Sequence, residues 1–171
     1  MIILSNYISL GVLLFNYYAI FEALFGNLEF ILGIQYILYI EHLIKDYTQN
    51  YIHINILKRP DGAYDCGLFN DGGLIDHKSG FPSGHMSVTS FFSHLYYFKY
   101  SNNINWKYYV YYNFINVLMA YARYSKKCHN IFQILGGYLL GYLIAYKFNY
   151  ISKFFNNKII KNENENQIND D

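Results

Sequence analysis

Five apolar stretches, separated by polar segments, most constrain how this chain of 171 residues can fold. A helix needs about 20 mostly apolar residues to span a bilayer, and residues 1–21 contain no charged side chain. The other four stretches are shorter and cover residues 30–40, 86–100, 108–122 and 131–146. Because they leave few residues for a water-facing surface, we predict an all-α, polytopic transmembrane bundle of about five helices. A soluble helical bundle, and four or six spanning helices, remain open alternatives.

The composition excludes several classes of protein. A formal net charge of +1 offers no basic surface for nucleic acid, and a hydrophobic content of 53% excludes a disordered chain. Two cysteines cannot build a disulfide-rich framework or a four-cysteine zinc site. Two free thiols are the default expectation for Cys66 and Cys128, and a disulfide between them on an oxidising side of the membrane is the alternative.

The chain has no linker that would divide its apolar part into two domains. Residues 1–155 are expected to form one membrane-embedded domain, and residues 156–171 a polar, low-complexity, disordered tail. The segment 46–81 is predicted to be a long loop, and loops of this length are usually functional or disordered. In the last apolar stretch, Gly137 and Gly141 form a small-xxx-small pair that suits close helix packing.

Both arginines and both prolines of the chain lie in three short segments, residues 58–60, 81–85 and 123–129. The planar guanidinium of Arg binds phosphate oxygens in pairs, and Lys does not replace it well. The second segment also has the pattern of a helix start, with Ser83 as its cap and free backbone amides that attract anions. If five helices cross the membrane in order, all three segments lie on the same side.

In this order the segments resemble the motifs of the type 2 phosphatidic acid phosphatase superfamily, which also contains the vanadium haloperoxidases. Those motifs are K-x6-R-P, P-S-G-H and S-R-x5-H-x3-D. Their counterparts here are Arg59-Pro60, with Ile52 at the place of the lysine; Pro82-Ser83-Gly84-His85; and Ala122-Arg123, His129 and Gln133 at the same spacing. The resemblance spans residues 45 to 141.

The resemblance implies a hydrolase of phosphoric esters or diphosphates that needs no metal and no cofactor. Its substrate would be a lipid phosphate or an isoprenoid diphosphate, hydrolysed through a phosphohistidine intermediate. His129 would be the nucleophile, His85 would protonate the leaving group, and Gln133 would stand where the family has an aspartate. The residues expected to hold the phosphoryl oxygens are Arg59, Ser83, Gly84 through its amide, Arg123 and Lys58.

Gln133 is the most consequential departure from the family pattern. A neutral amide in the corresponding role of a Ser-His-Asp triad costs roughly 10⁴-fold in kcat. The carbonyl of Gln133 nevertheless lies one helical turn after His129 and can accept its ring N–H, so a slowed enzyme is expected. The alternatives are a weakened or inactive member that binds lipid phosphate or acts as a scaffold, and a phosphotransferase that uses an alcohol acceptor.

The missing lysine of the first motif leaves a charge to be supplied from elsewhere. Lys58 is adjacent to Arg59 in sequence, whereas Lys45 precedes it by fourteen residues. A continuous helix would place Lys45 about 21 Å away unless the chain bends.

The expected location is an integral, multi-pass membrane protein whose partners are its lipid substrate and the bilayer. The distribution of Lys and Arg slightly favours a cytoplasmic tail and therefore a lumenal or extracellular site. The oligomeric state stays open.

Overall fold

The computed structural model describes residues 2–100 and 106–169, which form five α-helices and one short 3-10 helix. The α-helices are α1 (Ile2–Leu24), α2 (Leu28–Tyr51), α3 (Gly84–Tyr100), α4 (Trp106–Ser125) and α5 (Ile131–Asn169), and η1 (Asn55–Leu57) lies in the connection after α2. One helix covers each apolar stretch, which confirms the predicted all-α bundle.

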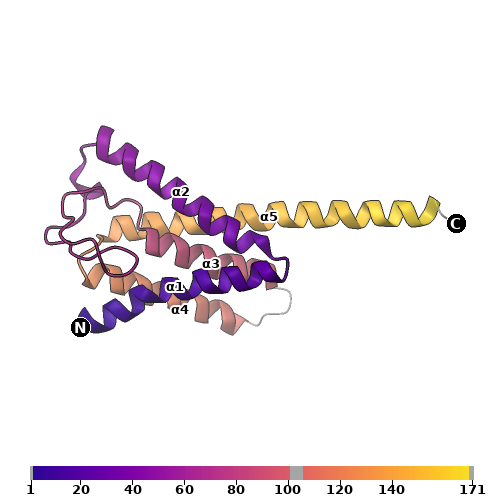
Figure 1. Ribbon diagram of the computed structural model, residues 1–171, viewed down its shortest axis with the longest axis horizontal. Coiled ribbons are helices and arrows are strands. Elements are labelled where there is room, and N and C mark those ends of the chain that lie inside the picture. The colour runs from indigo at the N-terminus through magenta and orange to yellow at the C-terminus, as the bar shows by residue number, and fades with distance from the viewer. Residues whose placement is uncertain (1, 101–105, 170–171) are drawn as a thin grey trace.

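The central element of the bundle is α3, which contacts each of the four other α-helices. Every residue from His85 to Leu95 is buried, as expected for a helix with neighbours on all sides. The long connection between α2 and α3 lies at the same end of the bundle as the N-terminus, and α5 projects beyond the other end (Figure 1). The end that carries the connection also contains the start of α3 and the start of α5.

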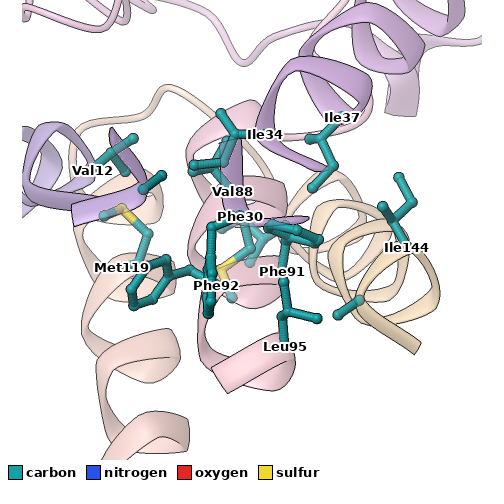
Figure 2. Packing of buried hydrophobic residues seen from close by; sticks show 14 residues of the cluster. Val12, Phe30, Ile34, Ile37, Val88, Phe91, Phe92, Leu95, Met119 and Ile144 are labelled. Atoms are coloured by element: carbon teal, nitrogen blue, oxygen red, sulfur yellow. The ribbon is translucent and has the colours of Figure 1, made fainter. Parts of the chain in front are cut away.

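A single apolar cluster holds the five α-helices together (Figure 2). Phe91 and Phe92 of α3 are at most 6% exposed, and the ring of Phe92 lies 4.7 Å from that of Phe15 of α1 and 5.4 Å from that of Phe30 of α2. Val12, Met119 and Ile144 contribute from α1, α4 and α5.

Two glycines let α5 approach α3 closely. A Cβ atom added at Gly137 would collide with the carbonyl of Ser83, and one added at Gly141 would collide with the carbonyl of Ser87. The close packing predicted from the small-xxx-small pair is therefore confirmed. As a consequence, the first turns of α3 and α5 lie side by side, and the Ser83 amide donates to the Gln133 carbonyl at 3.0 Å.

Of the helices in the described part of the chain, two are long and apolar enough to cross a membrane, within Ile3–Leu24 and Ile131–Phe154. Large apolar side chains on these two helices face outward, among them Leu14 at 69% and Leu139 at 56% exposure. The other three predicted spans form helices that carry more polar residues. Membrane association of the chain therefore has its direct support in α1 and α5.

Two expected boundaries differ from the structure. The second helix continues to Tyr51, so that the long loop begins at Ile52 and not at residue 46. In the structure α5 continues as a helix to Asn169, and so extends into the segment from residue 156 that is predicted to be a polar tail. From residue 142 to 169 the sequence has no glycine or proline that would end a helix already begun. Residues 170–171 lie outside the described part.

Candidate active site

A cavity of about 470 Å³ lies where the three polar segments meet. Its wall includes Arg59 from the first segment, Gly84 and His85 from the second, and His129 from the third. The predicted convergence of the segments is therefore confirmed. Apolar side chains continue the cavity away from these residues, and they are Val12, Leu13, Tyr17, Ile20, Leu38, Leu68 and Val88.

The start of α5 positions His129. Asn130 caps this helix, since its Oδ1 accepts from the Gln133 amide at 3.0 Å and its carbonyl accepts from the Ile134 amide at 3.1 Å. His129 lies just before the helix and is 2% exposed. Its Nδ1 is 3.1 Å from Oε1 of Gln133, and its Nε2 is 3.3 Å from Nη1 of Arg59.

The hydrogen bonds of Gln133 and Arg59 define which ring nitrogen of His129 carries the proton. Nε2 of Gln133 donates to the carbonyls of Ile56 and Lys58 at 3.0 and 2.6 Å, which turns Oε1 toward His129. A guanidinium only donates hydrogen bonds, so Nε2 of His129 accepts from Arg59 and the proton resides on Nδ1. Gln133 thus provides the orienting hydrogen bond expected of the aspartate, without its charge.

Electrostatics at this position favour a neutral imidazole. Burial lowers the pKa of His129 well below its ordinary value, and the positive charges of Arg59, Arg123 and Lys45 lower it further. Burial also lowers the pKa of Arg59, which a guanidinium tolerates without losing its charge at neutral pH. The His129 ring therefore keeps an unprotonated Nε2, whose electron pair accepts from Arg59 at the wall of the cavity.

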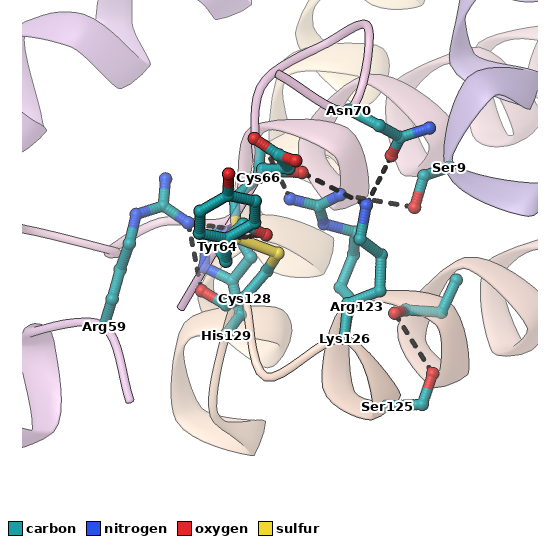
Figure 3. Close-up of a disulfide and its surroundings, with 12 residues drawn as sticks. Ser9, Arg59, Tyr64, Cys66, Asn70, Arg123, Ser125, Lys126, Cys128 and His129 are labelled. Carbon is teal, nitrogen blue, oxygen red and sulfur yellow. Dashed lines mark hydrogen bonds between the residues drawn. A yellow bond between two sulfur atoms is a disulfide. The ribbon is translucent and has the colours of Figure 1, made fainter. Parts of the chain in front are cut away.

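Cys66 and Cys128 form a disulfide, so the default expectation of two free thiols is wrong. The bond joins the long loop to the residue before His129, and Figure 3 shows the two arginines near it. Arg59 donates to the Cys128 carbonyl at 3.0 Å, and Arg123 donates to the Cys66 carbonyl at 2.7 Å. Each arginine therefore donates to the backbone carbonyl of one of the two bonded cysteines, which fixes both arginines beside the disulfide.

Removing this disulfide is expected to destabilise the protein. The cysteines are 62 residues apart, and closure of a loop of that length is worth about 4 kcal/mol in the chain-entropy description. The double variant Cys66→Ser/Cys128→Ser should therefore unfold at a clearly lower temperature than the oxidised protein. Thermal unfolding in detergent, with and without reductant, measures this. A reductant effect that persists in the double variant would contradict the assignment.

Several buried polar atoms near the cavity have no hydrogen-bond partner. In residues 3–100 and 106–154, whose side chains the structure describes, the buried side-chain nitrogen and oxygen atoms without one are Ser83 Oγ, His85 Nε2, Asn116 Oδ1 and Arg123 Nε. Three of these four belong to the predicted site. Because Ser83 Oγ makes no bond, the expected side-chain cap of α3 is wrong, and its carbonyl accepts from the Ser87 amide instead. Buried donors left unpaired are typical of sites that bind a ligand.

Four of the eight predicted site residues do not form the cavity wall. Gln133 lies behind His129, Ser83 precedes Gly84, and Arg123 is fully buried with its Nη1 donating to Ser9 at 3.2 Å. Lys58 lines a separate small cavity beside Ile52.

Two residues of α2 lie on the cavity wall, Glu41 and Lys45. Sequence reasoning offered Lys45 only as an alternative and missed Glu41. The sequence feature that could have identified them is their spacing: Glu41 and Lys45 are oppositely charged and four residues apart, so they lie on the same face of α2. The preceding turns of that helix bury apolar residues. In the described residues, no group of three or more His, Cys, Asp or Glu side chains is placed to hold a metal ion.

Comparisons with known proteins give one match. The family model of the PAP2 superfamily matches residues 26–157, a range that contains all three polar segments and α2 to the middle of α5. No curated protein and no solved structure matches the chain. Because the family model covers more than half of the sequence, including the residues that line the polar end of the cavity, the chain belongs to the PAP2 superfamily.

Proposed function

We propose that this chain is a membrane phosphatase that hydrolyses a lipid phosphate or an isoprenoid diphosphate through a phosphohistidine intermediate, without a metal. Membership of the superfamily supports a phosphatase-type activity on phosphate esters. The observation that carries the finer proposal is the hydrogen-bonding of His129. Its Nδ1–H is held by Gln133, and its Nε2 electron pair is directed to Arg59 at the cavity.

The proposed reaction has two in-line displacements at phosphorus. In the first, Nε2 of His129 forms the N–P bond while the bond to the leaving oxygen breaks and His85 gives that oxygen a proton. In the second, water attacks phosphorus, its proton passes to His85, and the N–P bond breaks to release inorganic phosphate. Arg59 and the Gly84 amide would stabilise the phosphoryl oxygens, which is most of what phosphoryl transfer requires.

The cavity supports an amphiphilic substrate. Its polar end contains Arg59, His85 and His129, and its apolar part is lined by α1 residues such as Val12 and Ile20. A phosphorylated head group would lie at the polar end and the hydrocarbon tail along α1, whose outer face is rich in exposed apolar side chains.

The neutral side chain of Gln133 supports a second candidate function, a weakly active or inactive member that binds lipid phosphate. Gln133 cannot stabilise an imidazolium by charge, as the aspartate of the family would. Such a protein would use Arg59 and the α3 N-terminus for binding without turnover.

A multi-pass arrangement with a lumenal or extracellular site is part of the proposal. The Cys66–Cys128 disulfide supports this side, because disulfides persist in oxidising compartments.

The test is phosphate release by the detergent-purified protein from a panel of phosphatidic acid, other lipid phosphates and isoprenoid diphosphates, in EDTA. We expect release from at least one amphiphilic substrate and none from a short, water-soluble phosphomonoester at the same concentration. Formation of the phosphate ester of an added alcohol, in place of released inorganic phosphate, would identify a phosphotransferase. Binding of the lipids without release would favour the second candidate.

Activity is expected to persist at mildly acidic pH. The nucleophile acts as the neutral imidazole, and burial with the cations Arg59, Arg123 and Lys45 lowers the pKa of His129. The neutral form of His129 therefore dominates down to a pH below about 6.5, the ordinary value for His, so the acid limb of kcat/KM should lie below that value. Burial and the same cations also lower the pKa of His85, so its proton-donating form is lost as the pH rises and kcat/KM should fall on that side as well. A profile of kcat/KM against pH, with buffers of constant ionic strength, measures the acid limb. A midpoint at or above the ordinary value would contradict a buried, cation-flanked nucleophile.

A further inference from the structure

A charged pair on α2 lies at the cavity although it belongs to none of the three motifs. Glu41 and Lys45 are one helical turn apart and form an ion pair, with side chains 10% and 25% exposed. Both line the same cavity as Arg59, His85 and His129. A partly buried ion pair loses hydration energy that its own attraction barely offsets, and this pair lies on the wall of a candidate phosphate site.

The lysine position of the first motif does not serve this cavity. Ile52, which stands there, lines a separate small cavity together with Lys58 and Ser79. Lys45 lies on the wall of the main cavity because α2 ends at Tyr51 and the chain then turns back, which brings Arg59 alongside the helix. The distance expected for a continuous helix therefore does not apply.

We propose, on the basis of the function proposed above, that Lys45 binds the phosphoryl group in place of the missing motif lysine. Glu41 is then a positioning residue: it holds the Lys45 ammonium at the cavity wall and yields that ammonium to the phosphoryl group when substrate binds.

The contacts of Glu41 support this exchange. Its carboxylate lies against Gly84, so closely that a Cβ atom at that glycine would collide with it. Gly84 is the first residue of α3, where the helix terminus favours negative charge. Among the charged side chains that line the cavity, two are cations, Lys45 and Arg59, and one is an anion, Glu41. A phosphoryl group prefers the same surroundings as the carboxylate and competes with it for Lys45.

The experiment measures binding of inorganic phosphate to the full chain in detergent by calorimetry, together with kcat and KM for the best lipid substrate. Lys45→Met is expected to weaken phosphate binding about tenfold or more, since it removes a charge-assisted hydrogen bond. Glu41→Gln is expected to tighten phosphate binding and lower KM, because the competing charge is lost while the side chain keeps its size. Lys78→Met is the matched control: Lys78 is exposed on the same loop as Arg59, and its loss should leave both quantities unchanged.

The double variant Glu41→Gln/Lys45→Met guards against a folding defect, because it leaves no unpaired buried charge. It should unfold at the temperature of the wild type and bind phosphate as weakly as Lys45→Met. Wild-type phosphate affinity in Lys45→Met or in the double variant would overturn the proposal. Phosphate binding that is weakened in Lys58→Ala but not in Lys45→Met would overturn it too. Weaker phosphate binding in Glu41→Gln would overturn the exchange with Glu41.

The two proposals fail differently. If the wild type binds phosphate in a Lys45-dependent way but hydrolyses none of the lipids, the proposed hydrolysis fails and the phosphate site stands. If Lys45→Met hydrolyses and binds like the wild type, the role of Lys45 fails and the hydrolase stands.

Discussion

His129→Ala is expected to lower phosphate release by on the order of 10⁴-fold or more, the largest effect of any single substitution in this chain. The reason is geometric as well as chemical: Nε2 of His129 is the unprotonated ring nitrogen and accepts from Arg59, and Gln133 holds the ring from the other side. Phosphate release from the lipid panel in EDTA measures the effect.

A matched control separates this loss from unfolding. His53 is exposed in the loop after α2, and His53→Ala should retain wild-type release. Covalent labelling adds an independent readout, because a phosphohistidine is acid-labile and stable in base. Label should appear in the wild type and in His53→Ala, and be absent from His129→Ala. Equal release by the two alanine variants would refute a nucleophilic role for His129.

Gln133→Asp, which restores the family residue, is expected to destabilise the protein without raising turnover. Nε2 of Gln133 donates to the Ile56 and Lys58 carbonyls, and the side chain is fully buried. Aspartate is shorter and ionised, so both carbonyls would lose their donor, at about 1–3 kcal/mol each. The unfolding temperature should fall by roughly 5 °C or more for a chain of this size.

Gln133→Glu is the control for side-chain length. It can still reach His129, but its second oxygen would face two carbonyl oxygens. Its destabilisation should shrink at low pH, where a protonated carboxyl group can donate a hydrogen bond. Thermal unfolding and kcat are measured for both variants. An unchanged unfolding temperature with higher kcat in Gln133→Asp would show that the site accepts aspartate and that Gln133 is a decayed catalytic position.

Local patterns predicted much of the architecture and part of the site. Each apolar stretch forms a helix, and such helices can be predicted because the pattern of apolar residues that favours a helix is contained within a few consecutive turns. The spacing of His129 and Gln133, four residues apart, placed their side chains together for the same reason. Gly137 and Gly141 indicated close packing without identifying α3 as the partner, which requires the whole bundle.

Other features depend on contacts between residues far apart in the chain. Lys58 is adjacent to Arg59 in sequence but lines a different cavity, whereas Lys45 shares the cavity of Arg59 because the chain reverses after α2. The Cys66–Cys128 disulfide likewise joins the long loop to the connection between α4 and α5, and no short pattern indicates that pairing.

The sequence by itself determined the helical class and the family, because these follow from apolar runs and from motifs with fixed spacing. The same motifs singled out two histidines and two arginines as candidate site residues, and these are His85, His129, Arg59 and Arg123. Only the tertiary structure decided which of these side chains line the cavity: Arg59, His85 and His129 do, and Arg123 does not. In the folded chain Arg123 donates to the Cys66 carbonyl, and Gln133 donates to two backbone carbonyls. Glu41 and Lys45 of α2 lie on the cavity wall. The physical reason is that a side chain's direction depends on the packing of whole helices, and the α3–α5 contact at Gly137 sets that packing.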